Sequence, residues 1–308
     1  RDQMSIQARM MAIADIFEAL TAYDRPYKRG KTLSEAMKIL ASMRDNNHID
    51  PDLFDIFVNQ ELYMDYAKEF LEPHQIDENK LDKAIVEYNV GSVLNVSNHT
   101  FSLNKWNSII KDIQAVALKT NHKIPVIYGV DAIHGATYIK NSTLFPQEIG
   151  LAATWNLSHA KKMAEITAYE TRASGVPWNF SPVLDLGVDP RFPRQFETFG
   201  EDPFLVTEFG KAMIKGYQGE ENKVGNSKVA ACMKHFTGYQ ATISGKDRTP
   251  AYIPDNVLFE YHIKSFKAAI DAGAKTVMIN SGLINGIPVH SSYKILTEIL
   301  RNKLGFQG

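Results

Sequence analysis

Apolar residues recur at every third or fourth position near the start of the chain. They are Ile6, Met10, Ile13, Phe17 and Leu20. This spacing predicts an amphipathic helix over residues 4–22. Asp24-Arg25-Pro26-Tyr27 interrupts the pattern, and Thr32-Leu33-Ser34-Glu35 then has the form of a helix-capping box. Two shorter helical patterns follow, over about 51–59 and 62–70, so we predict a small all-α segment over residues 1–77.

The pattern changes near residues 72–79, where strand-like apolar runs begin to alternate with amphipathic helices. The predicted strands are 90–96, 125–131, 179–186, 229–235 and 275–281. The predicted helices are 103–119, 157–173, 203–218, 256–272 and 293–304. This order is typical of a parallel sheet with helical crossovers. Because a closed barrel needs eight strand–helix units, the five units predict an α/β fold over 78–308, an incomplete (β/α) TIM-type barrel.

The composition of the chain argues against some classes of binding partner. The chain has 308 residues, a hydrophobic fraction of 44% and a formal net charge of -1. Such a balance predicts no nucleic-acid partner and no attraction to an anionic membrane. No apolar run reaches the length of a membrane span, and Arg1-Asp2-Gln3-Met4 does not begin a signal peptide. Localisation therefore stays unknown.

Polar residues follow each predicted strand at the end where chemistry is placed in (β/α) barrels. Asp131, Asp185, the Lys234-His235 pair and Asn280-Ser281 come at such ends, and Arg194 lies in a loop after the third strand. Many hydrogen-bonding groups at one end of the strands suit a ligand that carries many hydroxyls. Four aromatic residues stand nearby as possible stacking surfaces for a sugar ring, namely Trp178, Phe192, Phe236 and Tyr239.

Each of these residues also has a structural reading. Asp131 and His134 have the spacing of a weak metal pair, and the Lys-His pair is also compatible with a charged surface patch. For Arg191 we favour a bracing role through carboxylates such as Glu197 or Asp202. Cys232, the single cysteine, is expected to be a small core residue.

Longer motifs in the second segment resemble the N-terminal domain of glycoside hydrolase family 3, of the β-glucosidase type, from about residue 80 to 308. The resemblance rests on four stretches of sequence. They are the run from Ile124 to Gly135, Thr143-Leu144-Phe145-Pro146-Gln147, the run from Asp189 to Pro203, and Lys234-His235-Phe236. This resemblance implies a retaining enzyme that hydrolyses O-glycosidic bonds.

The resemblance also implies roles for individual residues. Asp131, Arg194, Lys234 and His235 would bind hydroxyls of the sugar in subsite −1, and Met278 and Ser281 would border the same site. The expected ligand is a β-linked glucoside or oligosaccharide, and no cofactor is implied. The loop after His235 lacks the histidine-aspartate pattern of the family's β-N-acetylglucosaminidase branch, which favours a glucosidase-like or xylosidase-like specificity.

The family's nucleophile is an aspartate on the strand that follows a Leu-Gly-Phe-x-Gly turn. Here that turn is Leu304-Gly305-Phe306-Gln307-Gly308, so we expect the nucleophile to lie beyond Gly308 and the acid/base glutamate in a later domain. Retaining hydrolysis needs both carboxyl groups. We therefore expect no complete set of catalytic residues in these 308 residues, and no turnover by them alone.

The first segment resembles the C-terminal end of an HD-GYP cyclic-diguanylate phosphodiesterase domain. The run from Ile6 to Thr21 carries this resemblance, followed by Asp24-Arg25-Pro26-Tyr27. It implies Asp15 as a remnant metal ligand, and Arg25 and Lys28 as phosphate-binding side chains. A divalent metal would be held only if the missing histidine-aspartate pair were present, because one carboxylate cannot hold a catalytic metal.

These resemblances predict two fragments of unrelated enzymes joined near residues 77–80. The leading hypothesis is a glycoside hydrolase with a sugar-binding half-site. The alternatives are a metal-dependent cyclic-diguanylate phosphodiesterase fragment and a non-catalytic carbohydrate-binding module. An open parallel sheet also invites pairing with other chains, so we expect self-association through its edge.

Overall fold

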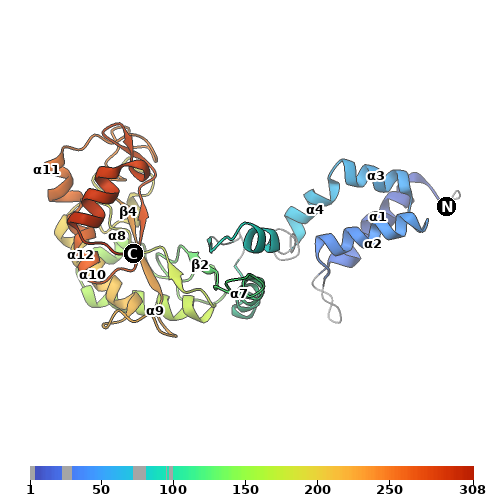
Figure 1. The fold of residues 1–308 in the computed structure, drawn as a ribbon, viewed down its shortest axis with the longest axis horizontal. Helices are drawn as coiled ribbons and strands as arrows, with labels where there is room; N and C mark the ends of the chain where they lie inside the picture. The colour runs from blue at the N-terminus through green and yellow to red at the C-terminus, as the bar shows by residue number, and fades with distance from the viewer. Residues whose placement is uncertain (1–3, 23–29, 72–80, 95, 97–99) are drawn as a thin grey trace. The chain divides into compact units, whose positions relative to one another are not determined.

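A computed structural model describes the whole chain except residues 1–3, 23–29, 72–80, 95 and 97–99 (Figure 1). It divides into two compact units. One comprises residues 1–91 and 113–125, and the other comprises residues 92–112 and 126–308. The predicted junction near 77–80, as well as Arg25 and Lys28, lies outside the described residues.

The first unit contains the four helices that the sequence predicts. They are α1 (Ile6–Thr21), α2 (Leu33–Asp45), α3 (Pro51–Asn59) and α4 (Leu62–Phe70). Their ends follow from local chemistry. Thr32 forms a complete capping box with Glu35, and the Asp50 side chain accepts two backbone N–H bonds at the start of α3. The apolar faces of the helices meet in a core that includes Phe17, Leu40 and Phe54.

The second unit is built on a curled sheet of five parallel strands, half a barrel, in the order in which they occur along the chain. The strands are β1 (Ser92–Leu94), β2 (Ile127–Val130), β3 (Trp178–Asn179), β4 (Ala230–Phe236) and β5 (Thr276–Ile279). The α/β prediction of a partial (β/α) barrel is therefore confirmed. Figure 1 shows β2 and β4 inside this unit, with helices around them.

The third strand is much shorter than the predicted 179–186. Pro182 has no N–H to donate to a ladder. The side chain of Asn179 instead bonds both backbone groups of Ala132, with its Oδ1 2.9 Å from Ala132 N and its Nδ2 3.0 Å from Ala132 O. Beyond Pro182, a single bridge joins Val183 to Lys234. The chain thus stays beside β4 without forming a regular strand.

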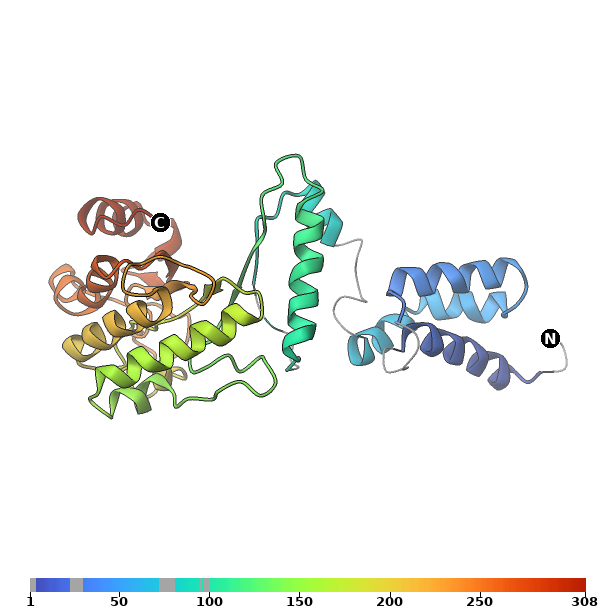
Figure 2. The same cartoon turned by 90° about the horizontal axis from the view of Figure 1, so that it is seen from below.

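Helices alternate with the strands along the chain (Figures 1 and 2). They are α7 (Leu103–Ala117), α8 (Glu148–Ala152), α9 (Leu157–Ala173), α10 (Pro203–Gln218), α11 (Asp255–Val257) and α12 (Lys264–Asp271). Helix α10 packs between α9 and α12. Its glycine at position 216 allows the approach to α9, because a Cβ there would lie 2.5 Å from the carbonyl oxygen of Lys161.

Several features of this unit were not predicted, among them the short helix α8. The expected helix 256–272 is interrupted by a π-helical stretch, η3 (Leu258–His262), and the expected helix 293–304 is π-helical over Lys294–Lys303. A short hairpin, β6 (Leu283–Ile284) and β7 (Ile287–Pro288), follows the fifth strand. Asn285 and Gly286 both have positive φ at its turn, the conformation that an Asn-Gly hairpin favours.

Candidate functional site

Three neighbouring strands deliver polar side chains to one edge of the sheet. Asp131 follows β2 directly, Asp185 lies in the segment after β3, and Lys234 and His235 are among the last residues of β4. Because parallel strands present their carboxyl ends at the same edge, the side chains of residues far apart in sequence meet there. We call Asp131, Asp185, Arg194, Lys234 and His235 the strand-end cluster.

Lys234 and Asp131 form an ion pair across β2 and β4. The Lys234 side chain is only 1% exposed, whereas that of Asp131 is 51% exposed. A buried ammonium needs a partner, since an isolated charge costs several kcal/mol to desolvate. The buried ammonium of Lys234 therefore lies against the carboxylate of Asp131, which is still open to solvent.

Asp185 fixes the orientation of the His235 ring. One carboxylate oxygen of Asp185 lies 2.7 Å from His235 Nδ1 and accepts the His235 backbone N–H at 3.1 Å. A carboxylate oxygen beside Nδ1 requires the proton on Nδ1. On the other side of the ring, Nε2 lies 3.4 Å from Nη1 of Arg194, which can only donate. An N–H of Arg194 Nη1 can therefore donate to the lone pair of Nε2 at this edge of the ring.

Arg194 is fixed by a bidentate bond to Glu197, with Nε 2.9 Å from Oε1 and Nη2 2.5 Å from Oε2. It also donates from Nη1 to the hydroxyl of Tyr239 at 3.2 Å, and Tyr239 in turn donates to Asp247. Burial opposes the charge of Arg194, but the hydrogen bonds and charge of Glu197 outweigh it and raise the guanidinium pKa. Burial, with the bond to Asp247, raises the pKa of Tyr239 to about 12, although Arg194 opposes this.

A buried carboxyl group lies near the cluster and was missed from the sequence. Glu148, at the start of α8, is fully buried. Its carboxyl faces the Val183 backbone N–H at 3.3 Å and the Ser181 hydroxyl at 3.4 Å. Burial raises its pKa well above the ordinary value, against the opposing effects of Val183 and Lys234. In sequence it looks like an acidic residue in the first turn of a surface helix, so no pattern signals its burial.

The structure brings together four of the six predicted binding residues, namely Asp131, Arg194, Lys234 and His235. Met278 lies beside Lys234 in the register of β4 and β5. Strand β5 ends at Ile279, however, so Ser281 lies two residues beyond it and is exposed. No described contact joins Ser281 to the cluster.

Several secondary expectations need correction. Phe192 and Phe236 are buried in the core and offer no face to a ligand, since Phe236 packs edge-on against Phe266. The bracing partner of Arg191 is Asp189, 2.7 Å away, and neither Glu197 nor Asp202. A two-residue turn brings Asp189 within reach, while Glu197 is occupied by Arg194. The core role expected for Cys232 is confirmed: it is buried, and burial raises the pKa of its thiol to about 11.

The donor sets considered for a metal do not fit one. His134 turns its Nδ1 toward the carbonyl of Phe145, 3.1 Å away, and Asp131 is paired with Lys234. Asp15 is exposed on α1. Within the described ranges, no group of three or more His, Cys, Asp or Glu side chains is placed to hold a metal ion. In the same ranges, no helix combines the length and hydrophobicity of a membrane span.

Comparison with known proteins gives two matches along the chain. Residues 63–308 match the Glycosyl hydrolase family 3 N terminal domain, and residues 1–53 match an HD domain. The second match agrees with the resemblance of the first segment at the level of an HD domain. The finer HD-GYP identity stays a prediction.

Individual relatives agree with the first match. The chain is 46% identical over 247 residues to a lysosomal beta glucosidase of Dictyostelium discoideum, an alignment that covers 76% of this chain and 30% of that protein. An exo-1,3/1,4-beta-glucanase of a Pseudoalteromonas species superposes with a TM-score of 0.70 at 32% identity, over 74% of this chain and 30% of that one. A beta-glucosidase of Listeria innocua, solved in complex with glucose, gives 0.64 at 35% identity, over 71% and 29%.

This chain spans about a third of the length of these relatives. The family match, by contrast, covers most of the chain and includes every residue of the strand-end cluster. Through residues 63–308 the chain belongs to the family of the glycosyl hydrolase family 3 N terminal domain.

Proposed function

We propose that the strand-end cluster binds the glucose-type ring of a β-linked glucoside and belongs to a β-glucosidase-type glycoside hydrolase. The observation that carries this proposal is the convergence of Asp131, Arg194, Lys234 and His235 at one sheet edge. The names of the relatives support the choice of sugar, since they include a beta glucosidase and a beta-glucosidase solved with glucose.

The hydrogen-bonding inventory of the cluster suits a polyhydroxylated ring. Asp131 accepts protons from two neighbouring hydroxyls, while Arg194 and Lys234 donate to sugar oxygens. A sugar hydroxyl that donates to His235 Nε2 takes the place of the Arg194 Nη1 donor, which lies 3.4 Å from that atom, while Nδ1 stays bonded to Asp185. Charged partners strengthen each bond to the ligand, and a ligand that lacks a matching hydroxyl leaves a buried group unpaired.

The carboxylates of the cluster, Asp131 and Asp185, and the neighbouring Glu197 are assigned to binding and positioning. Asp131 is neutralised by Lys234, Glu197 by Arg194, and Asp185 is bonded to His235. A nucleophile must be free to approach the anomeric carbon, opposite a second carboxyl group about 5–5.5 Å away. In line with the family resemblance, we assign the reacting pair to residues other than these three.

Saturation-transfer NMR tests the proposed ligand class directly. With the 308-residue chain we expect signal transfer to methyl β-glucoside and weaker transfer to β-xyloside. We expect none to mannitol, which has hydroxyls but no ring. Asp131→Asn should abolish transfer, because the substituted side chain offers one acceptor in place of two. Asp112→Asn, an exposed carboxylate on α7, is the matched control. Signal transfer in the Asp131→Asn variant equal to that in the unaltered chain would contradict the proposed function.

A hydrolysis assay separates binding from turnover. Aryl β-glucoside is incubated with the 308 residues and with a chain continued through further strands of the relatives' barrel. Because the three carboxylates above are assigned to binding and positioning, we expect no hydrolysis by the 308 residues and hydrolysis by the continued chain. Hydrolysis by the 308 residues would mean that a carboxylate of this sequence, Asp131 first, performs the chemistry.

A further inference from the structure

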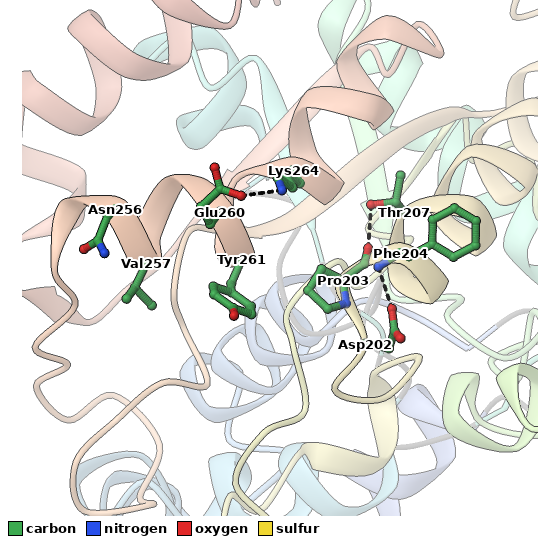
Figure 3. Close-up of a pocket in the computed structure, with 9 residues that line it drawn as sticks. All are labelled: Asp202, Pro203, Phe204, Thr207, Asn256, Val257, Glu260, Tyr261 and Lys264. Carbon is green, nitrogen blue, oxygen red and sulfur yellow. Dashed lines mark hydrogen bonds and ion pairs between the residues drawn. The ribbon is translucent and has the colours of Figure 1, made fainter.

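A pocket lies outside the strand-end cluster. It has a volume of about 700 Å³, and its walls come from the start of α10 and from the segment α11–η3–α12 (Figure 3). Its lining includes Asp202, Phe204, Asn256, Glu260, Tyr261 and Lys264. This volume falls within the range of small-ligand sites.

Two aromatic side chains of the pocket are exposed to solvent. Phe204 is 71% exposed and Tyr261 is 51% exposed. Figure 3 shows their rings on either side of Pro203. Exposed rings at one concave surface are unfavourable unless something covers them. The C–H face of a sugar ring is a suitable cover, because it is flat, apolar and bordered by hydroxyls.

The polar groups of the pocket suit a neutral ligand. Lys264 and Glu260 neutralise one another at 2.6 Å. Asp202 uses one oxygen to accept the backbone N–H groups of Phe204 and Leu205. Asp202 therefore remains a carboxylate without a cationic partner in the pocket, which disfavours phosphates and other anions.

Unused hydrogen-bonding groups complete the pocket. Among the described residues that line the pocket, none forms a hydrogen bond with the Asn256 amide or the Tyr261 hydroxyl (Figure 3). An amide supplies both donors and an acceptor, and a phenol supplies one of each. These are groups that hydroxyls of a sugar can satisfy.

Chain connectivity places the pocket at the same end of the sheet as the strand-end cluster. Arg194 and Glu197 lie in the loop that leads directly into Asp202, Pro203 and α10. The loop after β4, which carries Asp247, likewise leads into α11. We infer that this pocket is a second carbohydrate site, which holds a neutral β-glucan chain at Phe204 and Tyr261. The inference takes its ligand class from the proposed function.

Affinity electrophoresis in native gels that contain soluble mixed-linkage β-1,3/1,4-glucan tests the inference. We expect the 308-residue chain to be retarded, and Phe204→Ala and Tyr261→Ala each to lose at least about fivefold of that affinity, or about 1 kcal/mol. Tyr169→Ala removes an equally exposed ring from α9 and should behave as the unaltered chain. Near-ultraviolet circular dichroism checks that each variant is folded.

Glucose binding, measured on the same variants by calorimetry, separates this inference from the proposed function. Both aromatic variants should bind glucose within about twofold of the unaltered chain, a difference of less than about 0.5 kcal/mol. Retardation that survives in Phe204→Ala and Tyr261→Ala, or an unaltered chain that is not retarded, would overturn the second site. Retardation without any glucose binding would instead remove the strand-end site and leave this one standing.

Discussion

Asp185 decides what His235 can offer to a ligand. Its carboxylate oxygen holds the Nδ1 proton, so Nε2 is left as an acceptor. Asp185→Asn presents an amide that can donate to Nδ1 and so favours the other tautomer. We expect glucose affinity to fall about tenfold, or about 1.4 kcal/mol. Long-range ¹H–¹⁵N NMR of the ring should show Nδ1–H in the unaltered chain and Nε2–H in the variant.

The same two readouts distinguish positioning from a general loss of structure. Asp247→Asn, which alters the far end of the Arg194–Tyr239–Asp247 chain of bonds, should leave the His235 tautomer unchanged. An Nε2–H tautomer in the unaltered chain would contradict the assigned role of Asp185.

Glu148 makes stability depend on pH. Its folded pKa is raised by burial, whereas in the unfolded chain the carboxyl ionises near its ordinary value, about 4.3. The cost of ionisation begins as pH rises past the unfolded pKa and grows until pH passes the folded pKa. Glu148→Gln cannot ionise. Its melting temperature should equal that of the unaltered chain in acid and exceed it progressively through that window.

An exposed glutamate provides the control for this titration. Glu298→Gln, on the last π-helical segment, should give a melting curve parallel to that of the unaltered chain at every pH. A parallel curve for Glu148→Gln would mean that the buried carboxyl does not remain protonated in the folded protein.

At the scale of elements, the contact between α9 and α10 depends on Gly216. Alanine would add about 1 kcal/mol of helix propensity. Its Cβ would, however, lie 2.5 Å from both the Ala164 Cβ and the Lys161 carbonyl oxygen, and a helix backbone cannot shift cheaply. Overpacking costs typically about 1–3 kcal/mol, and two contacts of 2.5 Å place this site in the upper half of that range. After the gain in helix propensity, we expect Gly216→Ala to lower stability by about 1–2 kcal/mol net.

Chemical denaturation, followed by near-ultraviolet circular dichroism, measures this effect. Lys211→Ala, on the same helix but partly exposed, should change the free energy of unfolding by less than about 0.5 kcal/mol. A Gly216→Ala variant as stable as Lys211→Ala would show that the two helices separate without cost.

The elements also show how far the sequence reaches. Periodicity predicted all four helices of the first unit and placed α9 and α10 at their observed bounds, because each has one apolar face and clear caps. Periodicity overestimated the length of β3. Pro182 has no N–H to donate, and the Asn179 side chain, in place of backbone groups, bonds Ala132. Periodicity could not find the burial of Glu148 or the partner of Arg191, since both depend on which surfaces meet after folding.

The whole molecule has a sheet edge at β5. Beside it lies a groove of about 370 Å³ lined by apolar side chains that include Val277, Ile279, Leu296 and Phe306. An uncovered edge of this kind pairs readily with another chain. Self-association, which the sequence also predicted, remains a prediction. Sedimentation velocity of the 308-residue chain should show larger species as concentration rises, and one monomeric species at all concentrations would contradict it.

The central claim is that the strand-end cluster binds a glucose-type ring. Calorimetric titration with glucose, on matched arginine variants, tests it most directly. Arg194 lies in the cluster, whereas Arg191 is an exposed arginine three residues away, paired with Asp189. We predict that Arg194→Ala lowers the affinity for glucose at least tenfold, or about 1.4 kcal/mol, and that Arg191→Ala leaves it unchanged. Equal affinity in the two variants, or no binding by the unaltered chain, would contradict the claim.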